Sequence, residues 1–368
     1  MEIVTLILFL MGLVLLLCGA EVLVRGASAL AAAIGISPLV IGLTVVAFGT
    51  SSPELAVTIQ SGLSGQADIA LGNVVGSNIC NILLILGLAA LLSPLVVSQQ
   101  LIWLDVPLMI GLSFLVLFLG LDGKFGRLEG AFLFTGLIIY TIWSIYQSRK
   151  ESKQVKQEYV EEFAEDRTQT KRQLALHAAQ VIIGLAMLTI GSNWLVDGAI
   201  VMARALGVSE LIIGLTIIAI GTSLPEVAAT VVASLRGHGD IAVGNVVGSS
   251  IFNILSVLGI ASLVAPGGVT VPEEALYFDI PVMIAASIAC LPIFFIGHQI
   301  SRWEGGLFFG YYVAYILYLI LYASQHTALP AFSLVMRTFV IPLTAVTVMI
   351  LFVRAIRAHH RNLPKKVA

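Results

Sequence analysis

Two glutamates, Glu54 and Glu226, lie inside long apolar stretches, and oxygen-bearing side chains accompany each of them at helical spacing. Thr50 and Ser51 precede Glu54 by four and three positions, so the three side chains share one face of a helix. The same spacing recurs at Thr222, Ser223 and Glu226. An acidic side chain in the middle of a membrane span costs at least ~2.5 kcal/mol, so both glutamates are candidates for a functional role.

A proline precedes each glutamate and adds a second kind of oxygen ligand. Pro53 has no N–H, so the carbonyl of Gly49 loses its helical partner, and the proline ring bends the helix. Pro225 has the same effect on Gly221. At membrane depth such a carbonyl must be satisfied by protein, water or an ion.

The next apolar stretch after each glutamate contributes a hydroxyl and an amide. Ser77 and Asn81 are four positions apart, as are Ser249 and Asn253, so each pair shares a helix face. All these groups are oxygen donors, which suit hard cations such as Ca²⁺ and Na⁺, whereas zinc or copper would require imidazole or thiolate. The pattern therefore predicts a site for a hard cation inside a bundle.

Structural roles compete with ion binding at several neighbouring positions. Packing between helices is favoured for four glycines, Gly72, Gly76, Gly244 and Gly248. Hydrogen bonding between helices and ion binding are equally open for Asn73 and Asn245.

The remaining acidic residues near these stretches have simpler explanations. Glu21 lies four residues before Arg25, which predicts a local ion pair. Asp105 and Asp279 each precede a proline by two positions, which predicts that they begin helices.

The composition requires a membrane. Hydrophobic residues make up 58% of the 368 residues, charged residues only 11%, and the mean hydropathy is +1.02. A soluble domain has about 25% charged residues, because its surface must be wetted. The net charge of −2 provides no basic field for nucleic acid. The three cysteines at positions 18, 80 and 290 form no CxxC pair, so neither a disulfide framework nor a cysteine metal site is expected.

Eleven segments are long and apolar enough to cross a bilayer. They lie near residues 3–33, 37–64, 68–92, 101–120, 128–147, 173–206, 209–236, 240–265, 274–297, 304–324 and 329–353. If the polar connector 148–172 is cytoplasmic, fifteen Lys and Arg residues fall in cytoplasmic segments and three outside. This count predicts an external N-terminus and a cytoplasmic C-terminus in a cell (inner) membrane.

The chain contains an internal repeat. Residues 40–87 align with 212–259 at a constant offset of 172, with 29 of 48 positions identical. Each copy belongs to a unit of five spans, and an odd number inverts the second unit, as in many secondary transporters. The predicted fold is an all-α membrane protein with four regions. They are the first five-helix repeat 1–147, the connector 148–172, the inverted repeat 173–324, and an extra C-terminal helix with a basic tail, 325–368.

The two copies of Gly-Thr-Ser-x-Pro-Glu, each followed by Gly-Asn-x-x-Gly-Ser, resemble the alpha repeats of the cation/calcium exchanger superfamily, in its sodium/calcium exchanger branch. The resemblance implies counter-transport of Ca²⁺ against Na⁺ by alternating access, no cofactor beyond these ions, and movement of the first and sixth spans against the rest. It implies ion binding at Ala47 and Ala219 through their carbonyls and at Thr50, Ser51, Glu54, Ser77, Asn81, Thr222, Ser223, Glu226, Ser249 and Asn253.

Two features depart from the family's pattern. The eleventh span exceeds the ten-span plan of prokaryotic members. Asn253 stands where some members, including potassium-dependent ones, have an acidic residue, which argues against potassium dependence.

Other functions remain to be compared with sodium/calcium exchange. A Ca²⁺/H⁺ exchanger on the same scaffold is the alternative, although the proton-coupled branch usually lacks the Pro-Glu pair. A passive channel is less favoured, because channels prefer parallel symmetry around a pore. An intramembrane enzyme is disfavoured, because all six histidines lie outside the repeated motifs and no HExxH motif occurs.

Overall fold

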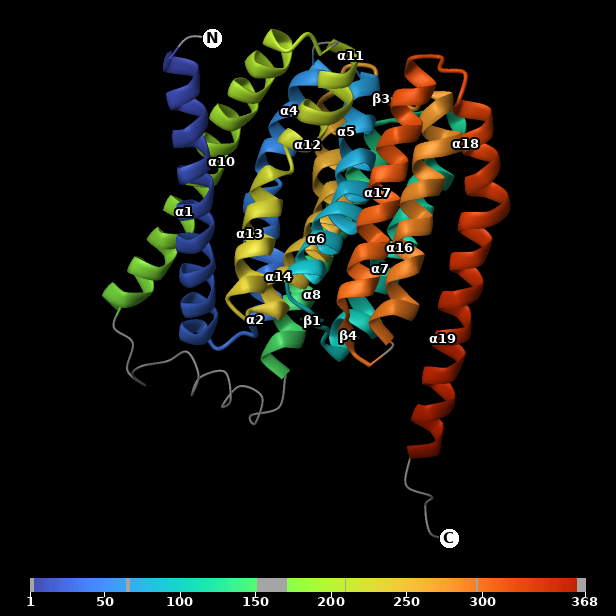
Figure 1. Cartoon of the computed structure of the whole chain (residues 1–368). Coiled ribbons are helices and arrows are strands. Elements are labelled where there is room, and N and C mark those ends of the chain that lie inside the picture. Colours follow the sequence, from blue (N-terminus) through green and yellow to red (C-terminus); the bar gives the residue numbers. More distant parts are fainter. Residues whose placement is uncertain (1–2, 64–66, 151–170, 209, 296, 363–368) are drawn as a thin grey trace.

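The computed structural model describes residues 3–63, 67–150, 171–208, 210–295 and 297–362, which form a helical bundle with short strands at its ends (Figure 1). In the labels, η marks π-helical segments, apart from the 3₁₀ turn η4. The elements before the connector are α1 (Ile3–Ile34), α2 (Pro38–Ile41), η1 (Gly42–Val46), α3 (Ala47–Thr50), α4 (Ser52–Leu63), α5 (Ala67–Ile79), η2 (Cys80–Leu86), α6 (Gly87–Leu92), β1 (Leu95–Val96), η3 (Leu101–Asp105), α7 (Val106–Leu119), η4 (Gly120–Asp122), β2 (Lys124–Phe125) and α8 (Arg127–Lys150).

The elements after it are α10 (Lys171–Ala205), α11 (Glu210–Ile213), η5 (Gly214–Ile218), α12 (Ala219–Gly221), α13 (Leu224–Leu235), α14 (Gly239–Phe252), η6 (Asn253–Leu258), α15 (Gly259–Val264), β3 (Val269–Thr270), η7 (Ala275–Asp279), α16 (Ile280–Phe295), β4 (Gln299–Ile300), α17 (Arg302–Ala323), α18 (Leu329–Val335), η8 (Met336–Val340) and α19 (Ile341–Asn362). Most of the connector lies outside the described residues.

The described part of the chain contains nine helices that are long and apolar enough to cross a membrane. A tenth crossing results if Pro38–Thr50 and Ser52–Leu63 count as one span with a bend of 43°. The bend falls just before Pro53, as the proline predicts. The seventh predicted span, 209–236, is divided among α11, η5, α12 and the 12-residue α13. The protein is therefore a multi-pass membrane protein, and the number eleven stays a prediction.

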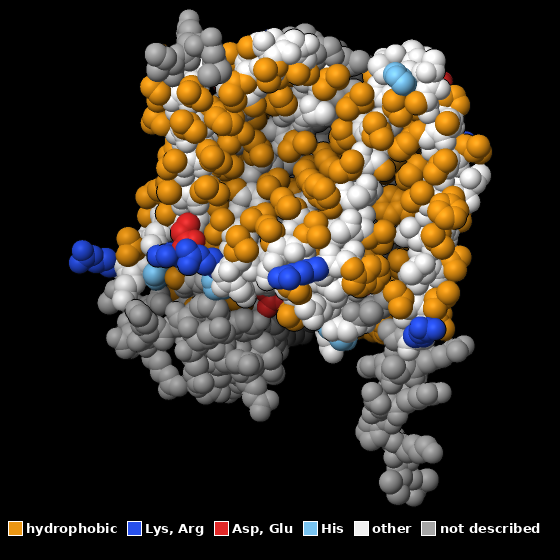
Figure 2. Space-filling model, viewed as in Figure 1, with side chains coloured by type: hydrophobic (Ala, Val, Ile, Leu, Met, Phe, Trp, Pro, Cys, Tyr) orange, Lys and Arg blue, Asp and Glu red, His pale blue; other side chains and the backbone are white. Residues whose placement is uncertain are grey.

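Hydrophobic side chains cover the flank of the bundle, and several Lys and Arg side chains gather near one end (Figure 2). The end of α8, the start of α10 and the end of α19 all lie at this end, whereas α1 begins at the opposite one (Figure 1). Glu21 and Arg25 lie in the second half of α1, which runs toward the charged end. The predicted ion pair between them is confirmed at 2.5 Å, and Arg236, which follows directly after α13, also binds Glu21 at 2.9 Å.

The long helices α1 and α10 pack closely because glycines line their contact. Glycines recur at intervals of seven residues on each helix, as Gly12, Gly19 and Gly26 on α1 and as Gly184, Gly191 and Gly198 on α10. A Cβ atom on Gly12 would lie 2.8 Å from the carbonyl oxygen of Gly191, and the reverse distance is also 2.8 Å. Only the absence of a side chain permits this approach.

Short strands join the two halves of the chain. Strand β1 pairs antiparallel with β4, and β2 pairs with β3, so each pair combines one strand from before the connector with one from after it. The pairs Leu95–Ile300 and Phe125–Val269 occupy corresponding places in the two sheets.

The prediction that Asp105 and Asp279 begin helices is wrong. The π-helical turns η3 and η7 lead into α7 and α16 and end at these aspartates. The carboxylate of Asp105 is buried and accepts the hydroxyl of Tyr140 at 3.1 Å, and that of Asp279 accepts the hydroxyl of Tyr315 at 2.8 Å. The spacing before a proline reflects only local structure. It therefore indicated a helix start and could not reveal a hydrogen bond to a tyrosine more than thirty residues away.

Candidate functional site

The glutamates are placed by two broken helices. Glu54 lies in the first turn of α4, directly after the break that ends α3, and Glu226 lies in the first turn of α13, directly after the break that ends α12. Ser51 and Ser223 occupy the breaks, with ψ angles of 6° and 5° instead of helical values. Each glutamate is 1% exposed.

Hydrogen bonds connect the two broken helices across the bundle. The hydroxyl of Ser51 donates to Oε1 of Glu226 at 3.1 Å, and the hydroxyl of Ser223 donates to Oε1 of Glu54 at 3.2 Å. Ser223 also lies 3.4 Å from the hydroxyl of Ser77. The first two contacts are equivalent, because the offset of 172 converts Ser51 into Ser223 and Glu54 into Glu226. Residues far apart in the chain are thus brought to one place.

The repeated asparagines hold this arrangement through hydrogen bonds. Nδ2 of Asn73 donates to the hydroxyl of Thr58 at 2.8 Å and to the carbonyl of Glu54 at 3.2 Å, while its Oδ1 accepts from Thr222 at 3.5 Å. The corresponding Asn245 donates to Thr230 at 3.0 Å and accepts from Thr50 at 3.2 Å. Of the two roles left open for these asparagines, the structure shows hydrogen bonding between helices.

The other predicted ligands lie on neighbouring elements. Ser77 and Ser249 lie on α5 and α14, and Asn81 and Asn253 lie at the starts of the π-helical segments η2 and η6. Such π-helical turns inside α-helices are frequent at functional sites. All four side chains are buried, whereas Thr222 is half-buried.

The two predicted carbonyl ligands, those of Ala47 and Ala219, differ in their hydrogen bonds. The carbonyl of Ala47 accepts the amide of Ser51 at 3.0 Å and the hydroxyl of Thr50 at 3.4 Å. The amide of Ser223 instead donates to Ile220 at 3.0 Å. Ala219 begins α12, and its side chain lies outside the described set.

Buried polar atoms without a hydrogen-bond partner concentrate at these residues. Among the described residues, eight buried side-chain atoms lack a partner, and six of them belong to predicted ligands. They are Oε2 of Glu54, Oε2 of Glu226, both amide atoms of Asn81, the hydroxyl of Ser249 and Oδ1 of Asn253. Buried polar groups are normally paired, so this concentration requires an explanation.

The site is negatively charged and rich in oxygen. Both ion pairs found in the described part of the chain involve Glu21, and neither Glu54 nor Glu226 has a cationic partner there. The same part of the chain has no cluster of three or more His, Cys, Asp or Glu residues that would suit a transition metal. Two carboxylates with hydroxyl and amide oxygens match the coordination chemistry of a hard cation.

One residue of this region has a role that the sequence did not indicate. Asn78 is buried between the halves, where its Nδ2 donates to the carbonyl of Ser250 at 3.2 Å and its Oδ1 accepts from Asn253 at 3.1 Å. The equivalent residue in the second repeat is Ser250 itself. This difference between the copies was the only signal in the sequence.

Helices α14 and α5 carry equivalent glycines but differ in how closely other elements approach them. A Cβ atom on Gly244 or Gly248 of α14 would lie 2.9 Å or 2.7 Å from the carbonyl oxygens of Leu39 and Leu43. A Cβ atom on the equivalent Gly72 or Gly76 of α5 would meet no heavy atom of the described residues within 4 Å. The packing role predicted for the four glycines is therefore confirmed for the α14 pair, and the described residues show no such packing for the α5 pair.

The loosely packed side lies toward the end of the bundle where α1 begins. Gly214 in η5 is also free of close neighbours among the described residues, whereas its counterpart Gly42 in η1 would place a Cβ 2.9 Å from the Ile241 carbonyl. We call the faces of α5 and η5 that carry Gly72, Gly76 and Gly214 the open flank. Elements α11 and α12 lie toward the end where α1 begins, and α2 lies at the opposite end (Figure 1).

Comparison with known proteins places the chain in a family. The sequence profile described as "Sodium/calcium exchanger protein" matches residues 4–146 and 176–321. Sodium/calcium exchanger MaX1 of Methanosarcina acetivorans is 34% identical over 306 residues, which cover 75% of this chain and 87% of MaX1. Inner membrane protein YrbG of Escherichia coli is 37% identical over 247 residues, which cover 67% of this chain and 74% of YrbG.

A solved structure of the sodium-calcium exchanger NCX_Mj is also similar, with a TM-score of 0.74 and 32% identity over 88% of this chain and 99% of NCX_Mj. The chain belongs to the sodium/calcium exchanger family, in the cation/calcium exchanger superfamily, and is a transporter rather than an enzyme. The eleventh predicted span, 329–353, lies beyond the region that the family profile matches.

Proposed function

We propose that the protein is an antiporter that exchanges Ca²⁺ for Na⁺ across the membrane by alternating access. The observation that carries this proposal is the pair of buried carboxylates, each held through one oxygen by a serine of the opposite half and each with its second oxygen unpartnered. Two such oxygens supply the charge that balances one Ca²⁺. The names of MaX1 and NCX_Mj support the same pair of ions.

The proposed ligands are the residues predicted from the sequence. They are the carbonyls of Ala47 and Ala219 and the side chains of Thr50, Ser51, Glu54, Ser77, Asn81, Thr222, Ser223, Glu226, Ser249 and Asn253. The ions themselves are the substrates, and the proposal requires no cofactor. Ca²⁺ and Na⁺ would bind in turn, because both need the same two carboxylates.

The proposed architecture is two inverted repeats of five crossings, 1–147 and 173–324, joined by the connector 148–172 and followed by an eleventh crossing within 325–368. The exchanged contacts support the inversion: Ser51 with Glu226 answers Ser223 with Glu54, and β1 with β4 answers β3 with β2. The segment 209–236 would be the broken seventh crossing, equivalent to the bent pair of the first half.

The distribution of Lys and Arg residues determines the proposed orientation of the protein in the membrane. With the connector and the basic tail in the cytoplasm, the end where α1 begins faces outward in the cell (inner) membrane. The open flank lies toward that end, so in this proposal ions would reach the site from outside along this flank. The closely packed contact of α14 with α2 and η1 would seal the site from the cytoplasm.

The test is ⁴⁵Ca²⁺ flux in vesicles that contain the purified full chain. An imposed Na⁺ gradient without a pH gradient should drive uptake, and neither a K⁺ nor an H⁺ gradient should do so alone. Uptake that follows only the pH gradient would establish the proton-coupled alternative. Flux that neither saturates nor depends on a counter-ion would indicate a channel.

A further inference from the structure

A cavity of about 480 Å³ lies between α16, α17 and the C-terminal helix formed by α18, η8 and α19. One of its walls is aromatic. The ring of Phe278 stacks on Tyr318 with centroids 4.1 Å apart and on Tyr315 at 6.1 Å, and Tyr318 stacks on Tyr322 at 6.1 Å. The volume is in the range of small-molecule sites. The ion site does not use this cavity.

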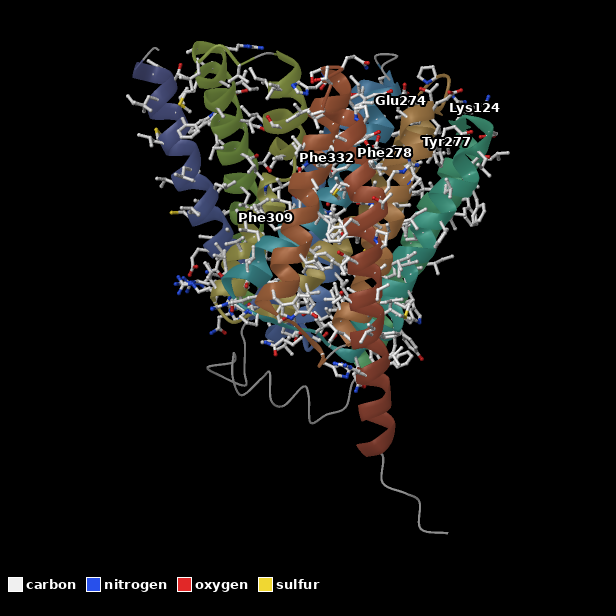
Figure 3. The ribbon with its side chains drawn as sticks, turned by 45° about the vertical axis from the view of Figure 1, so that its right-hand side comes forward. Lys124, Glu274, Tyr277, Phe278, Phe309 and Phe332 are labelled. Carbon is white, nitrogen blue, oxygen red and sulfur yellow. The ribbon has the colours of Figure 1, made fainter. Side chains whose placement is uncertain are left out.

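Two carboxylates and one guanidinium line this cavity, those of Glu274, Asp279 and Arg337. Figure 3 shows Glu274 toward the end of the bundle and Phe278 and Phe332 further in. Arg337 lies in η8, eight residues beyond the start of the helix at Leu329, which corresponds to about 12 Å along the helix axis. Arg337 is exposed and forms no ion pair with a described residue. A cation at this depth in a membrane span is costly without an anionic partner.

We propose that this cavity binds a phospholipid whose headgroup carries both an ammonium and a phosphate. In such a lipid the ammonium lies outermost, the phosphate lies below it, and the acyl chains follow. Glu274 would meet the ammonium, Arg337 would meet the phosphate, and the aromatic wall would pack beside the acyl chains. Arginine is well suited to phosphate because its guanidinium can form two parallel hydrogen bonds. An anionic headgroup fits less well, because it would place a negative charge beside Glu274.

This inference does not depend on which ions the protein exchanges. The C-terminal helix that forms the outer wall lies beyond the region matched by the family profile. Tyr311 of α17 holds this helix in place through a hydrogen bond from its hydroxyl to Thr344 at 2.8 Å. The lipid would therefore lie between the exchanger bundle and a helix that the profile does not include.

The experiment is native mass spectrometry of the delipidated full chain, titrated with phosphatidylethanolamine or phosphatidylglycerol. We expect one phosphatidylethanolamine per chain, bound more tightly than phosphatidylglycerol. Arg337→Gln should weaken binding by about tenfold, as the loss of a charge-assisted hydrogen bond implies. Arg354→Gln is the matched control, because Arg354 lies on the same helix outside the cavity, and it should bind the lipid as the wild type does.

Glu274→Gln tests the headgroup independently and should remove the preference for phosphatidylethanolamine. The proposal is overturned if the wild type binds both lipids equally, or if Arg337→Gln binds phosphatidylethanolamine as the wild type does. If Arg337→Gln does not fold, an unchanged preference in Glu274→Gln overturns it.

A second observation concerns Asn78 and rests on the proposed function. The carbonyl of Ser250 can only accept a hydrogen bond, so the amide nitrogen of Asn78 must face it. Oδ1 of Asn78 then faces Asn253 and requires the amide nitrogen of Asn253 as donor. The positions of the oxygen and nitrogen atoms in both amides therefore follow from the carbonyl of Ser250. A backbone carbonyl has no ambiguous orientation, unlike a side-chain amide.

We infer that Asn78 is a positioning residue that presents Oδ1 of Asn253 to the transported ion. That oxygen is buried and has no partner among the described residues. The first half lacks the equivalent device, because Ser250 stands at the position of Asn78 and its hydroxyl bonds to the carbonyl of Val246 at 3.0 Å. Accordingly, neither amide atom of Asn81 has a partner in the described structure.

The test is Asn78→Ser, because the repeat itself carries serine at the equivalent position. We expect the Ca²⁺ concentration for half-maximal exchange to rise by about three- to tenfold, the range that one hydrogen bond implies, with little change in maximal rate. In an Asn253→Asp background the same substitution should no longer raise this concentration, because a carboxylate has no donor for Oδ1 of Asn78 and its two oxygens are equivalent. Ser262→Ala, another buried polar change, is the control.

An unchanged half-maximal concentration in Asn78→Ser, or an equal shift in the Asn253→Asp background, overturns this inference. Absence of Na⁺-driven Ca²⁺ flux in the wild type would instead refute the proposed function. If Asn78→Ser does not fold, Asn78→Ala in both backgrounds supplies the same comparison.

Discussion

Gly76→Ala is expected to slow exchange without disturbing the packing seen in this structure. Gly76 lies on the open flank, where an added Cβ meets no heavy atom of the described residues within 4 Å. The substitution should therefore leave the fold, and ion binding from the open side, unchanged. In the opposite access state, α5 would have to pack against η5 as α14 packs against η1 in this structure.

The size of the effect follows from the closely packed side. A Cβ on Gly248 would lie 2.7 Å from the carbonyl oxygen of Leu43, closer than real Cβ atoms approach. In the opposite state, the Cβ that Gly76→Ala adds would meet the equivalent carbonyl oxygen of Leu215. Overpacking of this kind costs roughly 1–3 kcal/mol. At about 1.4 kcal/mol per factor of ten, the opposite state loses roughly fivefold to a hundredfold in population.

The assay compares ⁴⁵Ca²⁺ binding to purified protein with Na⁺-driven ⁴⁵Ca²⁺ exchange in vesicles. Gly76→Ala should bind Ca²⁺ as the wild type does and exchange it more slowly by that factor. Gly111→Ala is the matched control, because Gly111 also lies in a helix without a close neighbour but is not part of the open flank. Exchange at the wild-type rate in Gly76→Ala would refute the proposed packing of the second state.

Four further outcomes test the site and the topology. Glu54→Gln and Glu226→Gln should each lower Ca²⁺ exchange by about a hundredfold or more, because one carboxylate cannot balance a divalent ion. The control variant Glu129→Gln should exchange Ca²⁺ at nearly the wild-type rate. Near-normal flux in both Glu54→Gln and Glu226→Gln would contradict the site. Exchange should proceed without K⁺, because Asn81 and Asn253 are neutral, and a strict need for K⁺ would contradict this. Exchange should fall as the pH is lowered and recover with added Ca²⁺, since protons compete for the same carboxylates; inhibition that Ca²⁺ does not relieve would refute competition. A reporter fused to the C-terminus should score cytoplasmic, and an external score would show that the last predicted span does not cross.

The membrane class and the grouping of the candidate site's glutamates with neighbouring hydroxyls could be predicted because they depend on local patterns. Composition alone requires a bilayer, and the duplicated motif places Glu54 and Glu226 in equivalent positions. The bend before Pro53 also follows from the covalent chemistry of proline. These features need only the residue and its neighbours in the chain.

The partners of buried polar groups could not be predicted, because they lie far away in the sequence. Tyr140 is 35 residues from the aspartate that it binds, and Asn78 is 175 residues from Asn253. Helical spacing identifies residues on one face but does not show which helix that face meets. For the same reason the sequence could not show which glycines are packed.

The unequal packing of the two halves is itself informative about mechanism. Residues 40–87 and 212–259 share 29 of 48 positions, yet the glycines of α14 pack against α2 and η1, while those of α5 have no close neighbour among the described residues. The hydrogen bonds at the breaks differ as well, since the amide of Ser51 donates four residues back and that of Ser223 donates three residues back. Two copies that share most of their residues therefore adopt both packings. A state with the two packings exchanged is the second state that the proposed alternating access requires, and differential ion binding would shift the population between the two states.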